Sequence, residues 1–206
     1  MIKTLSMRIA SNLGFQLRSS EAEVEVYAYG LESFFNNFFA VLLLFLIAWG
    51  LQIIVPTLLV LTAFGLVRVP GGGAHLETYP RCLISSLLAM LILAILSTMF
   101  QSVETWTLLL GVVILAGGFV VVCAWVPAGT EKKMITDPAQ VKQQKYITSA
   151  TLLTAILTAS WCIYRGFPSQ AAAIIMGSMW GLFIITPLGY QVFHILDQGL
   201  DYLLRR

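Results

Sequence analysis

Long apolar runs separated by short polar connections occupy most of the chain. Each run is close to the ~20 residues that a helix needs to cross the hydrocarbon core of a bilayer. The runs cover residues 34–51, 53–69, 83–100, 106–126, 147–164 and 171–190. Only helices satisfy their own backbone hydrogen bonds in lipid without a closed barrel. The pattern therefore predicts an all-α fold, a polytopic membrane helical bundle of about six transmembrane helices within residues 34–190.

The first 20 residues follow a different pattern. Apolar side chains recur at helical spacing among polar and basic positions, at Ile2, Leu5, Ile9, Leu13 and Leu17. This pattern predicts an N-terminal amphipathic helix over residues 1–20 that lies in the membrane interface. The alternative is a short helix packed on the bundle. Residues 21–26 alternate Glu with Ala or Val, a strand-like period without a partner strand, and are interpreted as a polar lead into the first span.

Composition and charge fix the class and the orientation. Hydrophobic residues make up 58% of the 206 residues and charged residues 11%, so we expect a single integral membrane domain over residues 1–206. Of the 12 basic residues, only Arg165 falls on the outer side when the N-terminus is inside. The positive-inside rule then predicts a multi-pass protein of the cell membrane with both termini cytoplasmic.

Candidate chemistry lies between residues 70 and 86, where Gly71, Gly72 and Gly73 precede His75 and Cys82. On one straight helix His75 and Cys82 would be about 10 Å apart along the axis, whereas a base and its nucleophile approach to about 3 Å. A helix must therefore begin between them. Thr78 is the predicted N-cap, and a proline at residue 80 suits the first turn.

This arrangement places Cys82 in the first turn of a helix, where free N–H groups and the helix dipole favour a thiolate. The three glycines let the preceding loop turn back, so that His75 can take the thiol proton. The alternative is that Cys82 is a small apolar residue and the glycines form an ordinary loop. Glu77 is the nearest carboxylate, and His194 is interpreted as a helix cap or an interfacial residue. No metal-ligand motif, cofactor fingerprint or nucleic-acid motif is present.

The run Gly72-Gly73-Ala74-His75, the six residues between His75 and Cys82, and Ser85 and Ser86 soon afterwards resemble the AgrB (accessory gene regulator B) family. Members of that family are membrane cysteine endopeptidases that process quorum-sensing propeptides. Leu76 departs from the small residue that is common there, and Pro127-Ala128-Gly129 lacks the carboxylate of a later loop motif.

The resemblance implies that His75 and Cys82 are catalytic and that the substrate is a short AgrD-like propeptide. It also implies cleavage through an acyl-enzyme, followed by cyclisation to a thiolactone or lactone autoinducing peptide. No cofactor is expected. The alternative is a non-catalytic membrane peptide exporter or scaffold, in which the Gly-rich loop is a hinge.

Two further features have open interpretations. The loop over residues 127–146 carries four lysines, which either hold it on the cytoplasmic side or bind an acidic peptide tail. These candidate substrate-binding residues are Lys132, Lys133, Lys142 and Lys145. Gly177 and Gly181 form a small-xxx-small pair that suits close helix contacts within the bundle or between the protomers of a homodimer.

Overall fold

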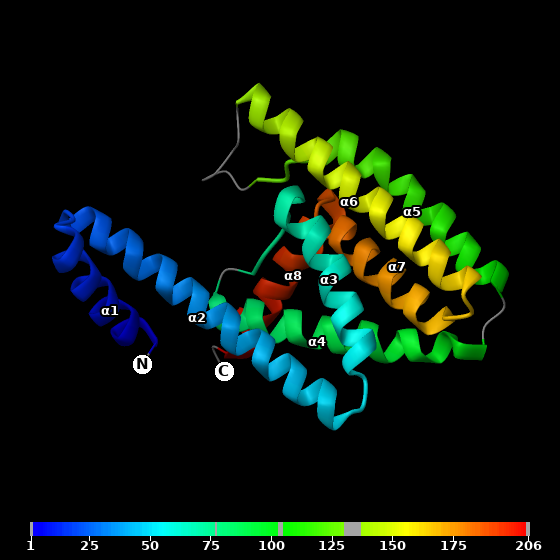
Figure 1. Cartoon of the computed structure of the whole chain (residues 1–206), viewed down its shortest axis with the longest axis horizontal. Helices are drawn as coiled ribbons and strands as arrows, with labels where there is room; N and C mark the ends of the chain where they lie inside the picture. Colours follow the sequence, from blue (N-terminus) through cyan, green and yellow to red (C-terminus); the bar gives the residue numbers. More distant parts are fainter. Residues whose placement is uncertain (1, 77, 103–104, 130–136, 205–206) are drawn as a thin grey trace. The chain divides into compact units, whose positions relative to one another are not determined.

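The computed structural model describes residues 2–76, 78–102, 105–129 and 137–204. Within these residues the secondary structure is helical, which confirms the predicted all-α class (Figure 1). The elements are α1 (Ile2–Leu17), α2 (Glu21–Gly50), α3 (Ile54–Gly71), α4 (Tyr79–Thr98), the 3-10 helix η1 (Met99–Ser102), α5 (Thr105–Trp125), α6 (Pro138–Tyr164), α7 (Pro168–Phe183) and α8 (Pro187–Leu204). The chain divides into two compact units, Met1–Gly50 and Leu51–Arg206.

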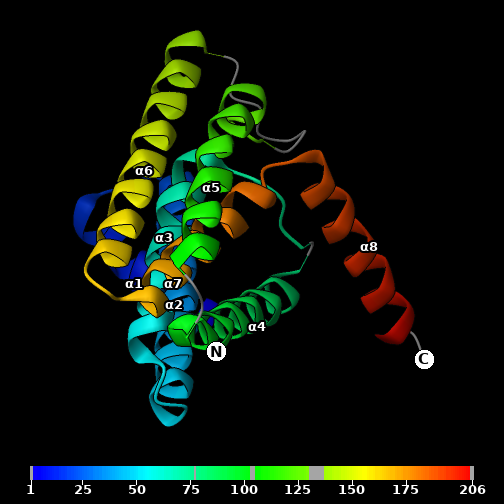
Figure 2. The ribbon, with the colours of Figure 1, turned by 90° about the vertical axis from the view of Figure 1, so that its right-hand side faces the viewer.

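In the described part of the chain, five helical segments are long and apolar enough to cross a membrane, and the bent pair α7–α8 supplies a sixth candidate. The prediction of one continuous span over residues 171–190 is wrong, because α7 and α8 are bent by 81° (Figure 2). Pro187 has no N–H to donate to the Phe183 carbonyl. The backbone N–H and the hydroxyl of Thr186 donate to that carbonyl instead, at 3.0 and 2.7 Å.

In the N-terminal unit, the segment that we interpreted as a polar lead is the first part of a 30-residue helix, α2. Ser20 and Glu23 form a capping box at its start. The Ser20 backbone N–H donates to the Glu23 carboxylate at 2.7 Å, and the Glu23 N–H donates to the Ser20 hydroxyl at 3.4 Å. This reciprocal cap satisfies amides that would otherwise be free, and it outweighs the strand-like alternation.

Small residues form the face of α1 that packs against α2, whereas most of the large apolar residues at helical spacing in α1 do not. Ser6, Ala10 and Gly14 are buried on one face of α1, and a Cβ atom at Gly14 would overlap the side chain of Val24. Those large apolar residues are exposed, with exposed fractions of 37% to 60% at Leu5, Ile9, Leu13 and Leu17. An interfacial helix needs such an unpartnered apolar face, so placement of α1 on the membrane surface stays a prediction.

The second unit is built around α7. Nine of its 16 residues are buried, and it packs against α3, α4, α5 and α6. Gly177 and Gly181 lie against α3, where a Cβ atom at Gly177 would be 2.5 Å from the carbonyl oxygen of Val60. The predicted small-xxx-small pair therefore serves a close contact within the bundle.

Candidate functional site

Cys82 lies at the start of α4, as predicted. Thr78 is the N-cap, with an extended backbone (φ −108°, ψ 141°), although its side chain makes no capping hydrogen bond. The Cys82 N–H donates to the Thr78 carbonyl at 3.0 Å and closes the first turn. The Ser85 hydroxyl donates to the Cys82 carbonyl at 3.0 Å, one turn further on. The helix therefore begins between His75 and Cys82.

The Gly-rich segment is tethered to the loop that follows α5. Gly71 is the last residue of α3, and Gly72 follows with a φ of 75°. The Ala128 N–H donates to the Gly71 carbonyl at 2.8 Å, and the Gly73 N–H donates to the Ala128 carbonyl at 3.0 Å. Gly72 and Ala128 thus form a short parallel bridge, and a Cβ atom at Gly72 would overlap the Ala128 carbonyl.

A second tether joins the same segment to the break between α7 and α8. The Ala74 N–H donates to the Ile184 carbonyl at 2.8 Å. A Cβ atom at Gly73, whose φ is 124°, would be 2.7 Å from that carbonyl oxygen. The glycines therefore let the backbone come close to two other segments, and this contact fixes the position of the residue before His75.

Arg68, in the last turn of α3, supports the loop from inside. Its Nη2 atom donates to the Ala74 carbonyl at 3.1 Å. The side chain is half-buried, and among the described residues it forms no ion pair. In the sequence, Arg68 contributed only to the count of basic residues that predicts the orientation. Its position one turn before the glycines was the signal that could have indicated a role in the site.

Cys82 lines a partly open cavity of about 550 Å³ between α3, α4, α7, α8 and the Gly-rich segment. Arg68, Ser85 and Ser86 are the other polar side chains in its wall. Apolar side chains form the remainder, including Trp180 from α7 and, from α8, Phe193 and Leu196. A mostly apolar concavity with a few convergent polar groups is typical of small-ligand and substrate sites.

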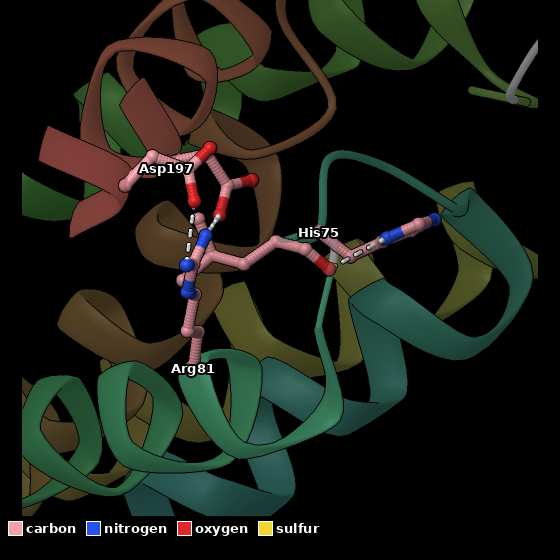
Figure 3. Close-up of polar contacts among 5 residues, drawn as sticks. His75, Arg81 and Asp197 are labelled. Atoms are coloured by element: carbon pink, nitrogen blue, oxygen red, sulfur yellow. Dashed lines mark hydrogen bonds and ion pairs between the residues drawn. The ribbon is translucent and has the colours of Figure 1, made fainter. Parts of the chain in front are cut away.

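The structure does not bring the two predicted catalytic side chains, His75 and Cys82, together. The His75 ring is exposed, and its Nδ1 atom lies 3.3 Å from the Leu76 carbonyl oxygen. Figure 3 shows the imidazole pointing away from Arg81 and the carboxylates of α8. Among the described residues, no hydrogen bond links His75 to Cys82. The loop and helix of the predicted pair are thus in place, and the ring is turned outward.

Arg81, immediately before Cys82, connects α4 to α8 (Figure 3). Its Nη2 atom is 2.6 Å from the Asp201 carboxylate, and its Nη1 atom is 3.5 Å from the Asp197 carboxylate. The sequence analysis did not predict these two aspartates. It named Glu77 as the carboxylate nearest to His75 in sequence, and Glu77 lies outside the described residues. The four-residue spacing of the two aspartates, which places both on one helix face, was the signal. The ion pair holds the helix that supplies Phe193 and Leu196 to the cavity.

Only two of the four candidate substrate-binding lysines are within the described residues, since Lys132 and Lys133 lie outside them. Lys142 is exposed on α6. The Lys145 ammonium donates to the Cys123 carbonyl at 2.6 Å, in the last turn of α5. A cation at this end of a helix is stabilised by free carbonyl groups and the helix dipole. Lys145 therefore has a structural role besides any role in binding.

His194 does not cap a helix, because α8 continues beyond it to Leu204. Its Nε2 atom lies 2.9 Å from the side-chain amide of Gln198, one turn later on the same helix. In the part of the chain that the structure describes, no three His, Cys, Asp or Glu side chains gather as a metal site would require.

Comparison with known proteins agrees with the resemblance noted in the sequence. The family described as accessory gene regulator B matches residues 3–185. A putative AgrB-like protein of Clostridium perfringens (strain SM101 / Type A) is 23% identical over 99% of this chain and 100% of its own length. Accessory gene regulator protein B of Staphylococcus carnosus (strain TM300) is 26% identical over 72% of this chain and 76% of that protein.

Accessory gene regulator protein B of Staphylococcus aureus (strain MW2) is 31% identical over 58% of this chain and 61% of that protein. No solved structure matches. The family match covers nearly all of the N-terminal unit, the Gly-rich segment, Cys82 and, of the helices around the cavity, α3, α4 and α7, whereas α8 lies beyond it. This multi-pass membrane protein belongs to the accessory gene regulator B family.

Proposed function

We propose that this protein is a membrane cysteine endopeptidase that cleaves an AgrD-like propeptide of an accessory gene regulator quorum-sensing system. The observation that carries the proposal is the placement of Cys82 in the wall of a substrate-sized cavity, at the start of a helix. His75 stands seven residues earlier, directly after a backbone position that is held by two hydrogen bonds. Family membership supports the propeptide as the substrate class.

In the proposed reaction, the Cys82 sulfur attacks a peptide carbonyl carbon while His75 takes the thiol proton. The carbonyl π electrons move to oxygen, the tetrahedral adduct collapses, and His75 protonates the departing amine. The acyl group then remains on the Cys82 sulfur as a thioester. A cysteine or serine within the bound peptide attacks the thioester carbonyl carbon, the bond to the Cys82 sulfur breaks, and the Cys82 thiolate leaves as the thiolactone or lactone ring is released. The reaction requires the His75 ring to leave the Leu76 carbonyl and turn toward α4.

The excess of basic residues on one side supports a cytoplasmic site. With that orientation a newly made propeptide meets Cys82 without crossing the membrane, and both termini of the enzyme are cytoplasmic.

The test is cleavage of a propeptide by membranes that contain the full-length protein. Cys82→Ser and His75→Ala should each abolish cleavage and leave membrane insertion unchanged, whereas Cys123→Ser, at an exposed cysteine outside the cavity, should cleave normally. With the wild-type protein, mass spectrometry should detect an acyl group on Cys82.

Wild-type cleavage rates in either Cys82→Ser or His75→Ala would falsify the assignment. If peptide still crossed the membrane in both variants and no cleavage occurred with wild type, the alternative function of a non-catalytic exporter or scaffold would be supported.

A further inference from the structure

The cavity beside Cys82 contains a cation that the proposed nucleophile and base do not account for. Arg68 lies within a candidate membrane-spanning helix, its side chain is half-buried, and it lines the same cavity as Cys82. Removing a guanidinium from water is unfavourable unless hydrogen bonds or a negative charge compensate it. A charged residue placed within a span usually marks a functional site.

The described partners of Arg68 satisfy it only in part. One donor, at Nη2, is used by the Ala74 carbonyl at 3.1 Å, and a guanidinium has five donors. The two ion pairs of the described residues both belong to Arg81, so no described carboxylate neutralises Arg68. Arg68 and Cys82 line the same cavity. A cation without a counter-ion among the described residues therefore lines the cavity in which a negative charge would develop if Cys82 reacted with a carbonyl.

We propose that Arg68 is a catalytic residue that stabilises the oxyanion formed when Cys82 attacks the peptide carbonyl. In that step the new bond joins the Cys82 sulfur to the carbonyl carbon, and the π electron pair moves to the oxygen. The remaining guanidinium N–H groups of Arg68 donate hydrogen bonds to this oxygen. These hydrogen bonds weaken when the carbonyl re-forms and the amine departs. The inference rests on the proposed function, because it needs Cys82 as the nucleophile.

The apolar cavity wall strengthens the effect. Preorganised donors aimed at a developing charge act most strongly where water is excluded, and loss of one such donor typically costs about 100- to 1,000-fold in kcat. The bond from Arg68 to Ala74 fixes the guanidinium before substrate arrives, so little reorganisation is needed during the reaction.

Two ligands separate this role from support of the loop. A peptide aldehyde based on the propeptide sequence adds to Cys82 and gives a tetrahedral adduct with an oxygen at the oxyanion position. Iodoacetamide alkylates the same sulfur without forming such an oxygen. A variant that lacks only the oxyanion contact should bind the aldehyde more weakly and should still be alkylated at the wild-type rate.

The experiment measures both quantities for the full-length protein in detergent. Arg68→Gln keeps an amide N–H that can donate to Ala74 and removes the charge. We expect a roughly 100-fold weaker aldehyde affinity with an unchanged alkylation rate, whereas Arg68→Lys should recover part of that affinity. Arg165→Gln, which removes a guanidinium that stacks on Trp161, is the matched control and should match wild type in both.

Each remaining outcome contradicts the inference. Equal aldehyde affinity in Arg68→Gln and wild type would exclude an oxyanion contact. A parallel loss of aldehyde binding and of alkylation would show that Arg68 only supports the loop. If the wild-type protein bound no aldehyde and Cys82→Ser still cleaved propeptide, the proposed function would fail first, and the role of Arg68 would fail with it.

Discussion

Replacement of Gly72 by alanine should detach the segment that carries His75. Gly72 has a φ of 75°, and an added Cβ atom would lie 3.0 Å from the Ala128 carbonyl carbon and still closer to its oxygen. An alanine at these backbone angles, φ 75° and ψ −149°, costs about 1–3 kcal/mol. The two hydrogen bonds of the bridge, Ala128 to Gly71 and Gly73 to Ala128, contribute about 1 kcal/mol each. Those hydrogen bonds hold the attached segment in the wild type as well, so only the strain at residue 72 and the overlap with the Ala128 carbonyl shift the equilibrium. We therefore expect a shift of about 1–3 kcal/mol in favour of the detached segment, or about 5- to 150-fold.

Hydrogen–deuterium exchange measures this directly, because the amides of Gly73 and Ala74 are protected only while the segment is attached. In Gly72→Ala the peptide that covers residues 70–76 should exchange faster, and propeptide cleavage should fall. Gly65→Ala is the matched control, since it lies in α3, the helix that precedes Gly72, and a Cβ atom there would meet nothing within 4 Å. The reasoning is refuted if the two variants exchange and cleave alike.

Three other predictions follow from the site. Arg81→Ala should speed hydrogen exchange over residues 190–201 more than Asp201→Ala does, because both α8 carboxylates lose their cation; equal exchange would contradict the role of this ion pair. Thr78→Cys, at an exposed position in a Cys-depleted background, should react only with thiol reagents that reach the cytoplasm. Labelling of intact cells by a membrane-impermeant reagent would contradict the predicted cytoplasmic location of the site. Neutralising the lysines of the 127–146 loop to Gln together should raise KM for an acidic-tailed propeptide more than it lowers kcat, and unchanged KM in a correctly inserted variant would leave the loop a topological anchor. That variant carries Lys132→Gln, Lys133→Gln, Lys142→Gln and Lys145→Gln.

Local signals in the sequence were sufficient where one short segment decides the structure. The start of α4 directly after its N-cap, Thr78, follows from a proline in the first turn and from the apolar periodicity after it. The apolar runs predicted the helices because lipid leaves the backbone few alternatives. The start of α2 was missed because the alternation of residues 21–26 was given more weight than the Ser20-x-x-Glu23 capping box.

Contacts between distant segments could not be predicted in the same way. Pro187 was visible in the sequence, but the apolar run continues on both sides of it, so hydrophobicity alone favoured one span. The pairing of Arg81 with Asp201 joins residues 120 positions apart and depends on the direction that α8 takes after the break. The same is true of Ala128, whose bond to Gly73 depends on how the end of α5 is placed beside the end of α3.

The break between α7 and α8 also limits how the chain length can vary. In an uninterrupted helix the Ile184 carbonyl would accept the N–H of residue 188, and here it accepts the N–H of Ala74. Connections between helices usually tolerate insertions and deletions. In this connection a single inserted residue would rotate the Ile184 carbonyl away from the Gly-rich segment and would move a wall of the cavity as well. Length changes that are neutral in other loops should therefore alter which peptides are processed.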